Sequence, residues 1–173
     1  MLARDPRKSR VTLNLDTYTP AFFTAIANKL ASGASKDYLK NFGIGIETWR
    51  VLALIAVAGE TTAQSICQFT GMDKGSVSKV MKQMLAKGLI VLATADRDKR
   101  VRLTQLTEEG QAMHDKIILY ALHRENSLLS VLTASERETL VRLLQRLKEN
   151  INRVDIDSSL YVKAHWHRES PQE

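Results

Sequence analysis

Small, hydroxyl-bearing and cationic side chains gather on one side of the segment 73–88. Its apolar residues recur at positions 77, 80, 81, 84 and 85, which is the spacing of a helix that buries a single face. The opposite face carries Gly75, Ser76, Lys79, Lys82 and Gln83. Hydroxyl, amide and ammonium groups of this kind read base edges or contact phosphates. The segment therefore predicts a helix that lies in the major groove of DNA.

A β-hairpin is predicted directly after this helix. Gly88 is expected to end the helix, because glycine takes a positive φ without strain. Residues 89–94 form a short apolar run, and residues 100–106 alternate between apolar and polar side chains, the period of a strand. The tip between the two strands carries Arg97 and Lys99, and one of these two cations is expected to lie in or along a minor groove.

Positive charge is concentrated in this helix and hairpin. Residues 73–102 contain eight lysines or arginines and three aspartates, whereas the whole 173-residue chain has a net charge of +6. A solvated amphipathic helix would also carry lysines, but it would not need a cationic hairpin beside it. The clustering favours a nucleic-acid backbone as the partner.

The composition indicates a chain that folds without disulfide bonds. A single cysteine, Cys67, excludes an internal disulfide framework and fits a reducing compartment. The first ten residues lack the apolar region of a secretory signal, and the longest apolar run, 51–58, is too short for a membrane span. We expect a cytoplasmic protein with no membrane partner, and an inert, buried Cys67. His165 and His167 make a poor metal site, so no metal or other cofactor is predicted.

Helical spacing and helix breakers place further elements on either side of the cationic segment. Thr19-Pro20 is typical of a helix start, with Thr19 as the N-cap, and we expect that helix to reach residue 41, with Gly33 permitting a kink in its middle. Residues 47–58 are nearly all apolar and predict a buried helix. A short helix at 62–70, a turn at Gly71 and a cap at Asp73 complete a helix-turn-helix pattern.

The rest of the chain supplies two more helices and two ends. Thr107 opens a helix that runs toward residue 129, and Thr133 to Glu136 form a capping box for the helix behind it. The apolar stripes of the first and last helices are too wide for the DNA-reading unit to cover. The fold class is mainly α with a small β-hairpin wing. The expected parts are a flexible segment 1–16, a helical dimerisation region 17–45 and 107–152, a winged helix-turn-helix domain 46–106, and a loose tail 153–173.

Three stretches resemble the MarR family of bacterial transcriptional regulators. The stretch FGIGIETWRVLALIA is similar to the family's entry to its second helix, and DKGSVSKVMKQMLAKGLI to its recognition helix. The stretch DRDKRVRLTQLTEEG resembles its wing and the helix start after it. The resemblance covers roughly residues 17–152. Many members have proline at the wing tip, where this chain has Asp96.

This resemblance implies a homodimer that binds double-stranded DNA, with named residues on two elements. The recognition-helix positions are Lys74, Gly75, Ser76, Ser78, Lys79, Lys82 and Gln83, and the wing positions are Arg97, Asp98, Lys99, Arg100 and Arg102. Asp98 is expected to pair with Arg100 and order the hairpin. The resemblance also implies a small aromatic effector. Trp49 is the residue proposed to contact it, although a plain core tryptophan is the more common situation.

Two other classes of protein are alternatives to a DNA-binding regulator. An enzyme is disfavoured, because the chain has no glycine-rich phosphate loop, nucleophile motif or ligand-spaced set of acids and histidines. The alternative is a winged helix that binds protein without DNA, but such domains usually lose the cations of the recognition face. We therefore predict a ligand-responsive repressor that acts as a homodimer on a pseudo-palindromic operator.

Overall fold

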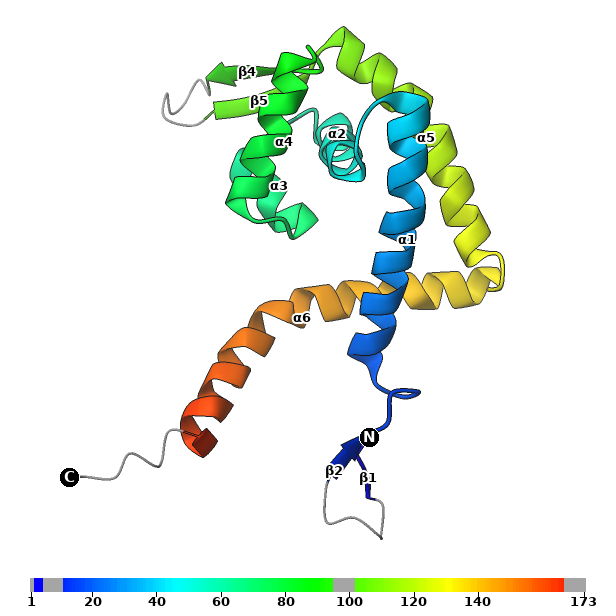
Figure 1. Ribbon diagram of the computed structural model, residues 1–173, viewed down its shortest axis with the longest axis vertical. Coiled ribbons are helices and arrows are strands. Elements are labelled where there is room, and N and C mark those ends of the chain that lie inside the picture. Colours follow the sequence, from blue (N-terminus) through cyan, green and yellow to red (C-terminus); the bar gives the residue numbers. More distant parts are fainter. Residues whose placement is uncertain (1, 5–10, 95–101, 167–173) are drawn as a thin grey trace, which may run out of the picture. The chain divides into compact units, whose positions relative to one another are not determined.

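The computed structural model describes residues 2–4, 11–94 and 102–166. The chain divides into two compact units, 1–121 and 122–173, which are described separately (Figure 1). The elements of the first unit are β1 (Leu2–Arg4), β2 (Val11–Leu13), α1 (Thr19–Phe42), α2 (Ile46–Ala58), β3 (Glu60–Thr61), α3 (Ala63–Thr70), α4 (Lys74–Ala86), β4 (Ile90–Thr94) and β5 (Arg102–Leu106). Helix α5 (Glu108–Leu129) begins in the first unit and ends in the second, which also holds α6 (Ala134–Trp166).

Helix α2 lies at the centre of the hydrophobic core. Val51, Leu52 and Ile55 have no exposed surface, as the nearly continuous apolar run predicted. Side chains from α3, α4, β4 and α5 pack around it, among them Ile66, Val77, Met84, Ile90 and Ile117. Burial of these side chains holds α3 and α4 in place, since each fully buried aliphatic residue contributes about 1.5–3 kcal/mol.

The helix boundaries follow the predicted breakers with one correction. Gly71, between α3 and α4, has φ 70° and donates its N–H to the Cys67 carbonyl, and Gly88 has φ 68°. The predicted N-cap Thr19 is wrong: Tyr18 occupies that position without a side-chain cap, and Thr19 is already helical. Gly33, where the sequence permits a kink, lies inside α1, which extends from Thr19 to Phe42.

The small sheet has three antiparallel strands in the order β3-β5-β4. Strands β4 and β5 form the predicted hairpin, in which Ile90 pairs with Leu106 and Thr94 with Arg102. The sequence did not predict β3, because two residues carry no recognisable period. Its pairing with β5 is reinforced by the Gln105 amide, which donates from Nε2 to Glu60 Oε2 at 2.9 Å.

Thr104 on the central strand β5 is fully buried, and its hydroxyl has no hydrogen-bond partner among the described residues. Because a buried hydroxyl without a partner costs about 1–3 kcal/mol, we expect Thr104→Val to raise the free energy of unfolding by about 1 kcal/mol in urea denaturation. Thr61→Val is the matched control, since Thr61 pairs with Thr104 across the sheet but its hydroxyl reaches a partner or solvent. A destabilised Thr104→Val protein would contradict the prediction.

Both ends of the chain contain more regular structure than predicted. Strands β1 and β2 pair in the segment that was expected to be flexible, with Leu2 opposite Leu13. Helix α6 continues to Trp166, so residues 153–166 are helical and not a loose tail. The reason lies in the sequence: the segment 134–166 contains neither glycine nor proline, and the Thr133–Glu136 capping box starts the helix as predicted, with Glu136 accepting the Thr133 N–H at 2.8 Å.

Within the described residues, no single helix is both long and apolar enough to cross a bilayer. Helices α1 and α2 pass that test only when they are taken together, and the pair is bent by 79° at the break between them.

Candidate nucleic-acid interface

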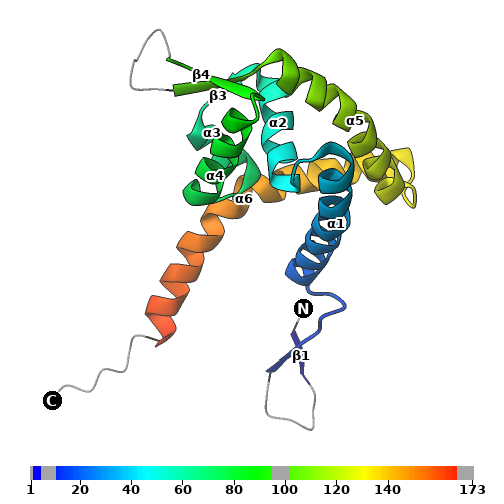
Figure 2. The same cartoon turned by 45° about the horizontal axis from the view of Figure 1, so that its top comes forward.

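Helix α3, the turn at Gly71 and helix α4 form the predicted helix-turn-helix. Thr62 caps α3 by accepting the Ser65 N–H at 3.1 Å. Helix α4 buries Val77, Val80 and Met84 against the core and leaves Lys79 and Lys82 exposed. The strands β4 and β5 of the hairpin follow and lie beside α4 (Figures 1 and 2). This arrangement places a cationic helix face beside a hairpin.

The first turn of α4 is closed by Asp73. Its carboxylate accepts the backbone N–H of Ser76 at 2.9 Å and the Ser76 hydroxyl at 2.6 Å. These two hydrogen bonds, the hydroxyl first, lower the pKa of Asp73 below its ordinary value. The Ser76 hydroxyl is therefore engaged as a donor, so Ser76 faces any ligand as an acceptor.

The cap should make folding stability depend on pH below about 4. A carboxylate whose pKa is lowered by folding stabilises the protein above its unfolded pKa, and this contribution is lost as pH falls through the folded pKa. We expect Asp73→Ala to lower the Tm at neutral pH. Asp73→Asn should retain most of the Tm, because asparagine also caps helices, but its Tm should change less than the wild type's at acid pH. Equal acid sensitivity of wild type and Asp73→Asn would contradict this assignment.

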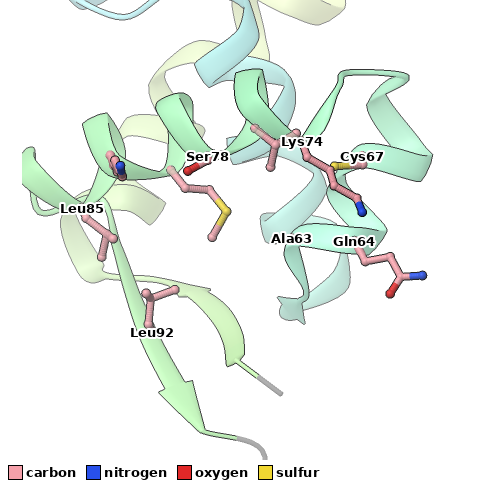
Figure 3. Close-up of a pocket in the computed structure, with 10 residues that line it drawn as sticks. Ala63, Gln64, Cys67, Lys74, Ser78, Leu85 and Leu92 are labelled. Atoms are coloured by element: carbon pink, nitrogen blue, oxygen red, sulfur yellow. The ribbon is translucent and has the colours of Figure 1, made fainter. Parts of the chain in front are cut away.

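One flank of α4 borders an open groove of about 650 Å³ between α3, α4 and β4 (Figure 3). Lys74, Ser78 and Lys82 line it from α4. Its other lining residues are mainly apolar, and the full set beyond those three is Ala63, Gln64, Cys67, Val77, Met81, Leu85 and Leu92. Cys67 was expected to be buried, but it is half-buried and lines this groove. Sequence reasoning missed the groove because its walls combine residues from three separate elements.

The opposite flank of α4 faces the junction between α1 and α2. Gln83 and Lys87 line a hollow of about 270 Å³ there, together with Gly43 and Thr48. Lys87 Nζ donates to the Gly43 carbonyl oxygen at 2.6 Å. Gln83 and Ser78 therefore lie on different flanks of α4, whereas Lys79 lies on the exposed face between them, as a rotation of 100° per residue requires.

Only part of the predicted wing lies in the described chain. Arg102 is exposed in β5, where it pairs with Thr94. The other four wing predictions, Arg97, Asp98, Lys99 and Arg100, lie outside the described residues.

Trp49 belongs to an aromatic cluster inside the first unit. Trp49 is 8% exposed, and its ring stacks on those of Tyr38 and His114, with centroid distances of 6.0 and 5.6 Å. Tyr120 meets Tyr38 edge-on and donates a hydrogen bond to Asp37 Oδ2 at 2.5 Å. Trp49 thus packs as a core residue that joins α1, α2 and α5.

The histidines do not form a metal site in the described part of the chain. No group of three potential histidine, cysteine or carboxylate ligands is found there. His114 instead hydrogen-bonds through Nδ1 to Asp115 at 2.9 Å, and this contact is the first cause of a lowered pKa for Asp115.

A short capped helix, a tight turn, a cationic second helix and an antiparallel hairpin define a winged helix-turn-helix, a class of DNA-binding domain. Residues 42–101 match the MarR family model. The chain is 31% identical over 114 residues to the multiple antibiotic resistance protein MarR of Salmonella typhimurium, covering 64% of this chain and 78% of that protein. A MarR/EmrR family regulator from Acinetobacter sp. ADP1 superimposes with a TM-score of 0.76 at 31% identity, over 82% of this chain and 99% of that one.

The chain belongs to the MarR family of transcriptional regulators, and its winged helix is a DNA-binding domain. Its relatives are regulators and not enzymes, as the sequence predicted.

Proposed function

We propose that the protein is a repressor that binds a pseudo-palindromic operator as a homodimer. The observation that carries this proposal is the exposed face of α4, where Lys79 and Lys82 stand free of the core on a helix fixed by the Asp73 cap. A helix of this kind fits the major groove, where lysine reads guanine edges or neutralises phosphate.

The two flanks of α4 suggest different tasks for the other proposed contacts. Lys74 and Ser78 lie on the flank that lines the groove toward β4, and we assign them to the backbone that the hairpin also approaches. Gln83 lies on the opposite flank, where its amide would reach an adenine edge or the other strand. The proposed DNA-binding residues of the helix and hairpin are Lys74, Gly75, Ser76, Ser78, Lys79, Lys82, Gln83, Arg97, Asp98, Lys99, Arg100 and Arg102.

Exposed apolar side chains on α1 support the homodimer. Phe22 and Ile26 on α1 are 49% and 48% exposed. A second chain packed against α1 would remove this apolar surface from water. A two-fold dimer also matches the local symmetry of a duplex. A MarR variant from Escherichia coli, 23% identical with a TM-score of 0.65 over 79% of this chain and 98% of that one, was crystallised with operator DNA.

Binding to the DNA upstream of the protein's own gene tests the proposal. We expect a saturable complex of two chains per site in fluorescence anisotropy, with an affinity that falls about 10³–10⁵-fold between 50 and 200 mM salt if the dimer neutralises about 6–10 phosphates. Absence of DNA binding at low salt would favour the protein-binding alternative, and a 1:1 complex would overturn the homodimer.

We also propose that a small aromatic molecule regulates this binding through Trp49. Structural neighbours bind such ligands: CouR from Rhodococcus jostii was crystallised with p-coumaroyl-CoA, and BpsR of Bordetella bronchiseptica is regulated by 6-hydroxynicotinic acid. Entry of an aromatic ring beside Trp49 would disturb its stack on Tyr38 and His114. In a Trp166→Phe protein, Trp49 is the remaining tryptophan. Its emission should therefore change at the effector concentration that releases operator DNA; release without such a change would remove Trp49 from the site.

A further inference from the structure

The amino-terminal end of α2 has no side-chain cap. Gly45 occupies the N-cap position, and no side chain there accepts a hydrogen bond from the first turn. The first hydrogen bond of the helix runs from the Trp49 N–H to the Gly45 carbonyl oxygen, at 3.1 Å. The backbone N–H groups of Ile46, Glu47 and Thr48 therefore have no acceptor within the described residues. A helix end of this kind carries about half a positive charge.

A nearly buried hydroxyl lies at the same helix end. Thr48 is 7% exposed, and its hydroxyl makes no hydrogen bond within the described part of the chain. Unlike the hydroxyl of Thr104, it is not sealed from solvent. Because Thr48 lines the hollow of about 270 Å³ beside α4, this hollow is the opening that its hydroxyl reaches. An unpartnered hydroxyl is costly to bury, so an acceptor bound in the hollow would stabilise it.

Two side chains of α4 add further donors at the hollow. Lys87 uses one of its three N–H donors on the Gly43 carbonyl oxygen, and its charge offsets the negative end of α1 at this place. Gln83 brings a carboxamide, whose NH₂ group can also donate. The acid of this turn, Glu47, is exposed and is not part of the lining. The free polar groups at the hollow are therefore mainly donors, and they select an anion.

The position of the hollow beside α4 identifies the source of the anion. A helix that lies in the major groove has a phosphate backbone on each of its two sides. On one side of α4, Lys74 and Ser78 border the groove toward β4. On the other side, Gln83 and Lys87 border this hollow. The first turn of α2 therefore meets the backbone that the opposite flank does not reach, and helix N-termini bind phosphate through their free N–H groups.

We propose that the first turn of α2 binds a phosphate of the DNA backbone, with the N–H groups of residues 46–48, the Thr48 hydroxyl and the Lys87 ammonium as donors. The contact rests on the placement of α4 in the major groove that is proposed above. It does not depend on base sequence, so it positions the protein on the duplex. Because α2 is the central helix of the core, the contact joins the packed centre of the domain to DNA.

Substitutions of Thr48 in the full chain test the site. Thr48→Val keeps the shape and removes the hydroxyl, so the affinity for the protein's own upstream DNA should fall about three- to tenfold in fluorescence anisotropy, because a hydrogen bond to a charged group is lost. Thr48→Ser should stay within about twofold of the wild type. The Tm of Thr48→Val should not fall, whereas a purely structural role for the hydroxyl would lower it. Thr61→Val is the matched control, since Thr61 is 8% exposed and lies outside the hollow, and it should leave DNA affinity unchanged.

A side-chain cap at Gly45 gives a second variant, in which folding and binding should change in opposite directions. Gly45 has φ −82° and ψ 165°, and nothing lies within 4 Å of a Cβ built there. Gly45→Asn can therefore accept the first-turn N–H groups with its own side chain. We expect a Tm at least equal to that of the wild type and a DNA affinity lower by about fivefold. A Gly45→Asn protein with a raised Tm and wild-type DNA affinity would overturn the site.

Neutralising single phosphates of the DNA locates the contact. With methylphosphonate linkages placed one at a time, one position per half-site should weaken the wild-type complex about five- to tenfold and the Thr48→Val complex less than about twofold. Equal losses in both proteins at every position would overturn the contact, as would equal DNA affinities of Thr48→Val and Thr61→Val. If no position separates the two proteins but inorganic phosphate releases DNA better than chloride at equal ionic strength, the site takes free phosphate and the DNA contact is wrong. A wild type that binds no DNA at low salt would overturn the placement of α4 itself.

Discussion

Replacing Lys79 and Lys82 together with alanine should lower operator affinity about 10²–10⁴-fold at 100 mM salt. Both side chains are exposed on α4, one on its outermost face and one at the groove beside β4. A homodimer would lose four cations from its two recognition helices, each worth about 1 kcal/mol or more at a DNA surface. Fluorescence anisotropy with the protein's own upstream DNA measures the loss.

The salt dependence then separates the two modes of contact. If both lysines contact phosphates, the slope of log affinity against log salt should flatten by about 3–4, because each phosphate contributes about 0.9. If they read bases, the slope should change little and discrimination between operator and random DNA should fall. Arg153→Ala with Lys163→Ala on α6 is the control, since it removes two exposed cations from outside the winged helix. Equal losses in the two double variants would contradict a specific role for α4.

Gly110→Ala should destabilise the fold by about 3 kcal/mol, because α5 starts in contact with the backbone that follows α4. A Cβ at Gly110 would lie 2.0 Å from the Leu89 carbonyl oxygen and 3.0 Å from its carbon. The same junction is closed by Thr107, whose backbone N–H donates to the Leu89 oxygen at 3.1 Å and whose hydroxyl donates to the Gly88 oxygen at 2.5 Å. Overpacking that must move backbone falls at the upper end of the usual 1–3 kcal/mol.

Thermal unfolding should show this as a drop in Tm of about 6–12 °C for a chain of this size. Gly45→Ala is the matched control: the backbone of Gly45 has φ −82°, and nothing lies within 4 Å of a Cβ built there. A Gly110→Ala protein as stable as Gly45→Ala would show that the close approach to Leu89 is not needed.

The sequence was sufficient for the elements that depend on local pattern. Periodicity and breakers predicted α2, α3, α4 and the hairpin strands, because each buries one clear face or ends at a glycine. Asp73 and Thr133 were predicted as caps from residue type and spacing alone, and both make the expected hydrogen bonds. The wing tip at 95–101 lies outside the described residues, so its predicted contacts stay predictions.

Features that depend on distant contacts were not predictable. Strand β3 forms because its two residues pair with the edge of β5, and a two-residue segment is too short to show the alternation that predicts a strand. The division of α4 into two flanks arises because β4 lies beside one and the α1–α2 turn beside the other. The tail was wrongly predicted, because its polar composition was given more weight than the absence of glycine and proline from residues 134–166.

The hydrogen bond from the Lys87 ammonium to the Gly43 carbonyl links α4 to α1. Gly43 ends α1, so the ammonium group lies at the negative end of that helix dipole. The last turn of α1 and the C-terminal end of α4 are thus connected by the side chain of one residue, Lys87, which lies 44 positions from Gly43 in the chain. A small shift of α1 would therefore be passed to α4 at the protein surface through this hydrogen bond, in addition to any effect through the core residue Tyr38.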